Sequence, residues 1–176
     1  MSEEQPQDGK DIIAIGYSDA KLERGFVLSY YRRCVRNMNE PTKSGNPPSV
    51  EGIVTRASPF SVKETLERLQ AAIHSRNLNL FAHIDHSGEA KRVGLTMQEA
   101  HVLIFGNPKG GTPLMIASPL LALDLPLKVL VWQGEENRVW VSSNSVAYLR
   151  DRYAIPQELV GNIAVIDAVI EQALKV

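Results

Sequence analysis

Apolar residues between Ser61 and Asn77 recur at intervals of three and four positions: Val62, Leu66, Leu69 and Ile73. This spacing places them on one face of a helix, the face that faces a core. Ser61 with Glu64 three residues later forms a capping box at the start. The pattern predicts a helix over 61–77 whose apolar stripe is buried.

Shorter apolar runs with alternating or β-branched residues predict strands. They lie near residues 50–57, 79–85, 101–106, 127–132 and 138–143. The last two flank the turn-forming segment Gly134–Asn137 and are typical of a β-hairpin. The pattern leaves the register of this hairpin open, so contact between Trp132 and Trp140 is not predicted.

The segment "IFGNPKGGTPLM" places Gly106 and Gly111 at the spacing of a phosphate-binding loop. Such a loop continues with Lys and then Ser or Thr, whereas Thr112 stands where the lysine belongs. Pro108 also removes one backbone donor. The sequence therefore predicts a turn that binds neither ATP nor GTP with Mg²⁺.

The same segment carries signals for a helix start. Thr112 is a suitable N-cap residue and Pro113 a suitable first residue, and Ser118 and Pro119 repeat the signature. Two short helices in series are predicted. A small anion could bind at the N-terminus of the helix that starts at Pro113, with Lys109 beside it.

Short and long helices are also predicted after the hairpin, and the last contains Ile163, Ile166, Val169 and Leu174. The order of elements indicates an α+β class, with an antiparallel sheet and helices packed on one face. Residues 50–176 are predicted to form this single domain. Residues 1–49 are predicted to be an extension, partly disordered, with a possible helix at 21–37 and a linker at 39–48.

Composition narrows the function classes for this chain of 176 residues. Its net charge of -1 does not favour a nucleic-acid partner. The longest apolar run, 113–123, is too short to cross a bilayer. A single cysteine, Cys34, and an acidic start fit the cytoplasm, which is the predicted location.

Candidate chemistry begins in "HIDH", at the end of the second strand. Asp85 and His86 form a possible acid–base pair, and His83, Asp85 and His86 are the candidate metal ligands. A complete metal site needs a further ligand, such as Glu99 or His101. In the structural alternative Asp85 caps a helix that begins at Ser87. The sequence identifies no cofactor and does not decide whether the protein is an enzyme.

Asn107 and Lys109 follow the third strand, on a loop held by rigid elements. If they converge with Asp85 and His86, the four side chains form a small polar or anionic ligand site.

The chain resembles the bacterial and archaeal "domain of unknown function 302" family. The segments "IDHSGEAKRVGL", "VLIFGNPKGGTPLM", "LDLPLKVLVW" and "VWVSSN" followed by "YL" carry the resemblance, over about residues 50–155. It implies a TATA-binding-protein-like β-α-β(4)-α arrangement and a homodimer, and no activity.

Some positions depart from the family. Where members often have Asn-Asp-Pro, this chain keeps Asn144, which is therefore a candidate ligand-binding residue, but continues with Ser145 and Val146. Tyr153 stands near the position of a histidine in members. His83 is not a feature of the family.

Three function classes follow. The favoured class is a module that binds or senses a small ligand or anion. The alternatives are an enzyme that uses Asp85 and His86 as acid–base groups or metal ligands, and a homodimeric interaction protein without a ligand.

Overall fold

A computed structural model describes residues 47–176 of the chain. The chain divides into the units Met1–Ser44 and Gly45–Val176, and the second unit contains all elements given below. The predictions for the N-terminal extension, including its helix, its linker and Cys34, lie outside the described residues apart from residues 47–49.

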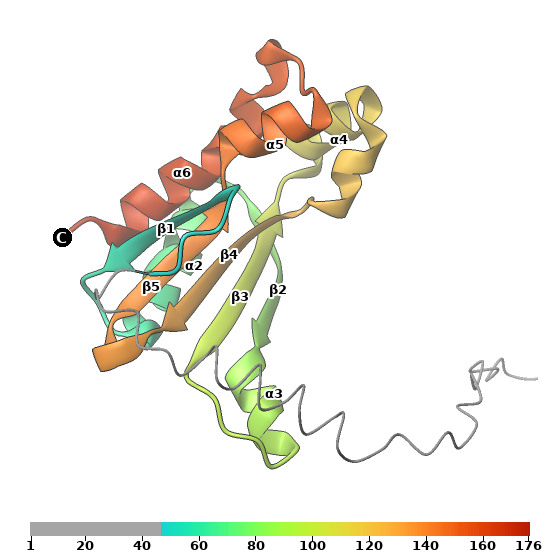
Figure 1. Ribbon diagram of the computed structural model, residues 1–176. Coiled ribbons are helices and arrows are strands. Elements are labelled where there is room, and N and C mark those ends of the chain that lie inside the picture. The colour runs from blue at the N-terminus through green and yellow to red at the C-terminus, as the bar shows by residue number, and fades with distance from the viewer. Residues whose placement is uncertain (1–46) are drawn as a thin grey trace, which may run out of the picture. The chain divides into compact units, whose positions relative to one another are not determined.

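Five antiparallel strands form one sheet with the spatial order β1-β5-β4-β3-β2 (Figure 1). The strands are β1 (Ile53–Ser58), β2 (Asn79–Asp85), β3 (Ala100–Gly106), β4 (Leu127–Gln133) and β5 (Val139–Asn144). All five predicted strands are confirmed, and β1 begins later than predicted because Gly52, at φ 78°, still belongs to a turn.

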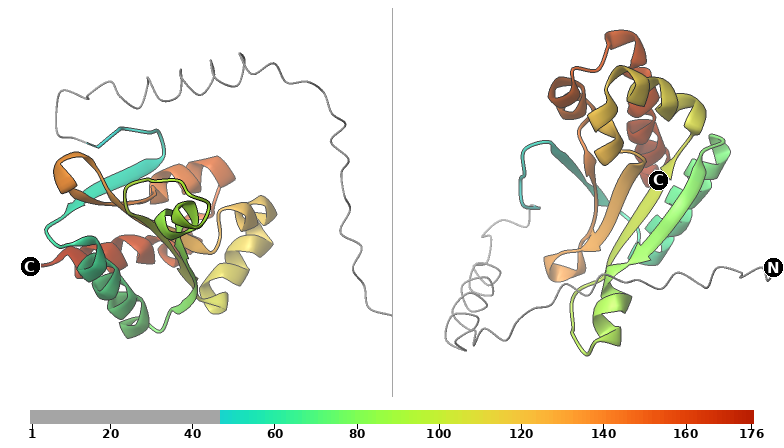
Figure 2. Two further views of the ribbon diagram at one scale, coloured as in Figure 1. Left: turned by 90° about the horizontal axis from the view of Figure 1, so that it is seen from below. Right: turned by 90° about the vertical axis from the view of Figure 1, so that its right-hand side faces the viewer.

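Two long helices, α2 (Val62–Ser75) and α6 (Gly161–Leu174), lie together on one side of the sheet (Figures 1 and 2). The shorter elements are α3 (His86–Arg92), α4 (Pro108–Ala117), η1 (Pro119–Leu123), η2 (Glu135–Asn137), α5 (Val146–Tyr153) and η3 (Gln157–Leu159). The predicted α+β class is confirmed. The relation to TATA-binding-protein-like folds stays a prediction.

The core lies between the two long helices and the sheet. Helix α2 buries all four residues predicted from its stripe, and the Ser61 hydroxyl accepts a hydrogen bond from the Glu64 N–H as the capping box requires. Alternate strand residues, among them Leu103, Phe105 and Val129, are fully buried against these helices. Their neighbours along the strands, such as Val102 and Leu130, face away and are only partly buried.

The hairpin of β4 and β5 pairs Trp132 with Trp140 directly across the strands. Their ring centroids lie 6.3 Å apart, within the range of favourable aromatic contacts. The structure thus settles a contact that the sequence left open.

The predicted start of the helix after β3 is wrong. Helix α4 begins at Pro108, and its N-cap is Asn107, whose side chain accepts from the Lys109 N–H. Pro113 therefore lies inside the helix, and Thr112 does not cap it. Gly110 and Gly111, which were expected in a turn before the helix, belong to the first turns of α4.

Candidate functional site

The candidate residues divide between two ends of the sheet. Antiparallel pairing places Asn79 opposite Gly106, and Asp85 opposite His101. Asp85 therefore lies at one end of β2 and Asn107 beyond the other end, roughly 20 Å away at about 3.3 Å per strand residue. The fold therefore does not bring Asp85 and His86 together with Asn107 and Lys109, so the condition for one shared site is not met.

Asp85 is the N-cap of α3. Its Oδ1 accepts hydrogen bonds from the Ser87 hydroxyl at 2.6 Å and from the Gly88 N–H at 2.7 Å. The Ser87 hydrogen bond, then the Gly88 N–H and the nearby His101 and His83, hold the pKa of this carboxyl below its usual range. The capping role considered for Asp85 is thus confirmed, with the helix beginning one residue earlier than expected.

Two histidines lie beside this cap. His83 Nε2 and His101 Nδ1 are 3.3 Å apart, and His101 Nδ1 is 3.6 Å from Asp85 Oδ1. His101, which the sequence suggested with Glu99 as a further metal ligand, thus lies close to Asp85. Within residues 47–176, however, no group of three or more His, Cys, Asp or Glu side chains is arranged to hold a metal ion.

His86 is the first residue of α3, and it is exposed. The fold places the His101 imidazole, rather than that of His86, close to the Asp85 carboxylate. Asp85 and His86 are adjacent only in the sequence. The catalytic and metal roles considered for His86 stay predictions.

The N-terminus of α4 already satisfies its own backbone donors. The Lys109 N–H donates to Asn107 Oδ1, and the N–H groups of Gly110 and Gly111 donate to the Asn107 carbonyl oxygen. The Asn107 amide also donates to the Asn77 carbonyl oxygen at 3.4 Å. Asn107 therefore caps α4, while a ligand-binding role for it stays a prediction. The helix start at Pro113 that was expected to bind an anion is not formed, because α4 begins at Pro108.

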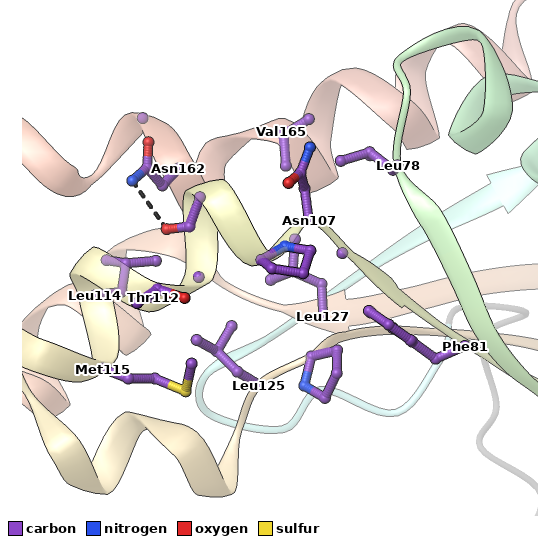
Figure 3. A pocket seen from close by; sticks show the side chains of 16 residues that line it. Leu78, Phe81, Asn107, Thr112, Leu114, Met115, Leu125, Leu127, Asn162 and Val165 are labelled. Carbon is purple, nitrogen blue, oxygen red and sulfur yellow. Dashed lines mark hydrogen bonds between the residues drawn. The ribbon is translucent and has the colours of Figure 1, made fainter.

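A pocket of about 430 Å³ opens beside this helix start. Figure 3 shows side chains around the same space, among them Phe81 of β2, Leu114 of α4 and Val165 of α6. Its lining is largely apolar and comprises Leu78, Phe81, Gly106, Asn107, Pro108, Gly110, Gly111, Thr112, Leu114, Met115, Leu125, Pro126, Leu127, Gly161, Asn162 and Val165. Its volume lies in the range of pockets that bind small molecules.

Polar groups in the pocket are few. Asn162 of α6 donates to the Gly110 carbonyl oxygen at 3.0 Å, so this amide holds α4 against α6. Thr112 contributes an exposed hydroxyl, and Asn107 contributes its amide. The described lining includes no charged side chain, and Lys109 is not part of it.

Asn144 lies elsewhere, at the end of β5 opposite Ile53. It lines a separate hollow of about 340 Å³ on the sheet face away from α2 and α6, together with Thr55, Trp132 and Ser142. In this hollow Trp132 Nε1 donates to the Ser142 hydroxyl at 2.9 Å. Asn144 therefore shares no site with the other candidates.

Of the residues that line the main pocket, the sequence indicated only Asn107 as a candidate for ligand binding. Phe81 is the clearest omission, because it lies at a register shift between Leu80 and Ala82 and is 52% exposed. A bulge of this kind turns a side chain to the other face of a strand. The sequence did carry one signal for this irregularity. Strict alternation along the strand places the apolar Phe81 on the same face as the polar residues His83 and Asp85.

The fold and the pocket define a small α+β domain with a mostly apolar cavity. The chain belongs to the family described as "Domain of unknown function DUF302", whose sequence profile matches residues 54–173. The resemblance found in the sequence is thereby confirmed.

Similar proteins carry another description. The chain is 39% identical over 153 residues to "Fluoride-specific ion channel FluC 1" of Brucella suis, which covers 82% of this chain and 58% of that protein. A protein of the same description from Brucella abortus and "Fluoride-specific ion channel FluC 2" of Brucella melitensis match at the same identity, over 55% of their length. The chain thus spans little more than half the length of these relatives.

A solved structure shares the fold. The crystal structure of an uncharacterized conserved DUF302 protein from Bacillus stearothermophilus matches with a TM-score of 0.60 at 18% identity. The match covers 71% of this chain and 97% of that one. In the described part of the present chain, no helix has the length and apolarity needed to cross a membrane.

Proposed function

We propose that the domain binds a small, uncharged and mostly apolar molecule in the pocket beside α4. The observation that carries the proposal is a 430 Å³ cavity with apolar walls and a few amide and hydroxyl groups at its edge. Such a combination is typical of small-molecule sites, in which apolar walls supply affinity and polar groups fix orientation.

The lining argues for an uncharged ligand over an anion. A buried charge without a partner loses its hydration, and the described lining offers no cation to replace it. The N-terminus of α4 at Asn107 provides few free donors for an anion, because its first N–H groups are already hydrogen-bonded. The anion named among the sequence-based candidates is therefore the weaker class.

Binding can be measured with the uncharged fluorescent probe N-phenyl-1-naphthylamine and 1-octanol as competitor. Thr112→Trp on α4 and Gly106→Val on β3 should fill the pocket from two sides. A Cβ at Gly106 would lie 3.6 Å from the Pro126 Cβ and 3.7 Å from Phe81, so it enters the cavity without a clash. Each variant should weaken probe binding at least about tenfold, a change of about 1.4 kcal/mol.

Ile116→Trp is the matched control, since Ile116 lies on α4, is 77% exposed and does not line the pocket. It should bind the probe as the original protein does. Equal binding by all variants would show that the probe does not occupy this pocket. Tighter competition by octanoate than by 1-octanol would replace the uncharged class with an anion.

We also propose that the domain associates with a fluoride channel. The proposal is supported by the relatives described as fluoride channels, because this chain matches only part of their length. In those proteins a little under half of the chain lies outside the match, and the described matching residues here hold no helix that could span a membrane. The channel named in their descriptions would then reside in the unmatched part.

Co-expression tests this second proposal. This chain and the unmatched part of the Brucella suis protein should co-purify from detergent, and fluoride release from loaded cells should change when this chain is present. An unrelated membrane protein of similar size serves as the control. Absence of both effects would reject the proposal and leave the pocket proposal unaffected.

A further inference from the structure

The wall that α4 contributes to the pocket carries one hydroxyl group between apolar side chains. Pro108, Thr112 and Met115 all line the pocket, and they are four and three residues apart along the helix. Residues at this spacing lie on one face of a helix. Thr112 therefore presents its side chain on the pocket face of α4 (Figure 3).

The Thr112 hydroxyl forms no hydrogen bond with any other residue of the range 47–176. A threonine within a helix can donate to the carbonyl oxygen four residues earlier, which is that of Pro108 for this side chain. Thr65 in the first turn of α2 does form such a bond, to the Ser61 carbonyl oxygen at 2.8 Å. The Thr112 hydroxyl is therefore available to a ligand, either as donor or as acceptor.

The two amides of the pocket are more constrained than this hydroxyl. Asn107 uses both its amide oxygen and its amide nitrogen in hydrogen bonds at the start of α4. Asn162 uses its nitrogen to hold Gly110, and only its oxygen has no partner among the described residues. Thr112 is thus the residue whose polar group can turn to a ligand without breaking a contact of the fold.

Phe81 and Met115 provide exposed apolar surface in the lining of the same pocket. Phe81 is 52% exposed and Met115 is 36% exposed. An aromatic ring packs favourably against a second ring and against a thioether sulfur. Both side chains therefore favour an aromatic ligand over a saturated one of the same size.

Resting on the pocket binding proposed above, we propose that the ligand is an aromatic molecule with a single hydroxyl group, of the phenol or naphthol class. Its ring lies against Phe81 and Met115, and its hydroxyl bonds to Thr112. Such a hydroxyl is uncharged at neutral pH and suits a described lining without charged side chains. An aromatic hydrocarbon would instead cover the Thr112 hydroxyl and leave it without a partner.

Equilibrium dialysis, with the bound compound quantified by chromatography, tests the hydroxyl. The two compounds are 2-naphthol and 2-methylnaphthalene, which carries a methyl group in place of the hydroxyl. The ratio of their affinities should fall about fivefold in Thr112→Val, the change expected from one neutral hydrogen bond. Thr112→Ser, which keeps a hydroxyl, should retain the ratio of the original protein.

A second pair of compounds, 2-naphthol and the saturated decahydro-2-naphthol, tests the ring. Their affinity ratio should fall about fivefold in Phe81→Leu, which keeps an apolar side chain but removes the aromatic contact. Phe60→Leu is the matched control, since the Phe60 ring lies 3.9 Å from the Arg68 guanidinium and does not line the pocket. It should leave the ratio unchanged.

Gly106→Val separates this inference from the proposed pocket. If it weakens 2-naphthol binding while Thr112→Val keeps the first ratio, or Phe81→Leu and Phe60→Leu change the second ratio equally, the inference is overturned and the pocket stands. If Gly106→Val leaves 2-naphthol binding unchanged, the compound lies elsewhere and the inference is also overturned. Absence of binding by both 2-naphthol and the fluorescent probe would reject the pocket and the inference together.

Discussion

The two ends of the β2–β3 hairpin differ in what their residues do. At the α3 end, polar side chains are close together, His83, Asp85 and His86 among them are exposed, and α3 buries none of its residues. At the α4 end, the residues are mostly apolar, several are buried, and they enclose a cavity. The end that is richer in reactive side chains thus uses them in hydrogen bonds with one another and with the start of α3, whereas the apolar end encloses a cavity.

This contrast shows why residue type alone misplaces a site. Asp85, His83 and His101 attract attention as acid, base or ligand, yet Asp85 is used to cap α3. Glycine, proline and leucine residues around α4 carry no such signal, but their backbone geometry leaves a space that a ligand can fill. The comparison predicts different responses to mutation at the two ends.

The largest effect is expected for Leu114→Ala. Leu114 is 1% exposed and packs beneath the pocket, so its truncation removes apolar contacts and leaves a cavity. The free energy of unfolding should fall by about 2–5 kcal/mol, measured by urea denaturation.

Val93→Ala is the control at the α3 end, where the side chain is 73% exposed, and it should change stability by less than about 0.5 kcal/mol. If the two substitutions lowered the free energy of unfolding equally, the two ends would not differ in how much they contribute to stability.

Much of the fold could be predicted from the sequence because local and tertiary signals agree. In α2 the cap at Ser61 and the apolar stripe predict the same helix, and the core accepts that stripe. In β3 the unbroken apolar centre predicts a central strand, and the strand is paired on both sides.

The start of α4 could not be predicted because two cap–proline pairs compete. Asn107–Pro108 and Thr112–Pro113 carry the same signature, and Gly110 and Gly111 between them disfavour a helix by about 1 kcal/mol each relative to alanine. Packing decides the outcome: Leu114 is buried and Asn162 donates to the Gly110 carbonyl oxygen. These contacts come from α6 and the core, which no local pattern contains.

A smaller effect is expected when the cap of α4 is removed. Asn107→Ala should lower the free energy of unfolding by roughly 1 kcal/mol, because the Lys109 N–H loses its side-chain acceptor. Thr112→Ala should have almost no effect on stability, since Thr112 lies within the helix and is exposed. Thermal unfolding of both variants decides between the two cap–proline pairs. A larger loss of stability in Thr112→Ala than in Asn107→Ala would indicate a helix that starts at Pro113.

The smallest effect concerns the pKa of Asp85 at the α3 end. Hydrogen bonds from Ser87 and Gly88 favour the ionised carboxyl, so its pKa in the folded protein lies below the ordinary value of 3.8. The cap therefore stabilises the folded protein above pH 3.8, and this stabilisation is lost as the pH falls through the lower folded-state pKa.

NMR titration of the Asp85 carboxyl measures this shift directly. Ser87→Ala should move the pKa of Asp85 back toward 3.8, because the Ser87 hydroxyl is the largest cause of the shift. His101→Gln should move it less, because the interaction with His101, 3.6 Å away, is a smaller cause of the shift than the hydrogen bonds from Ser87 and Gly88. A larger effect of His101→Gln would instead make the histidine the main partner of Asp85. It would turn the α3 end from a helix cap into a coupled acid–base pair, and the contrast between the two ends would fail.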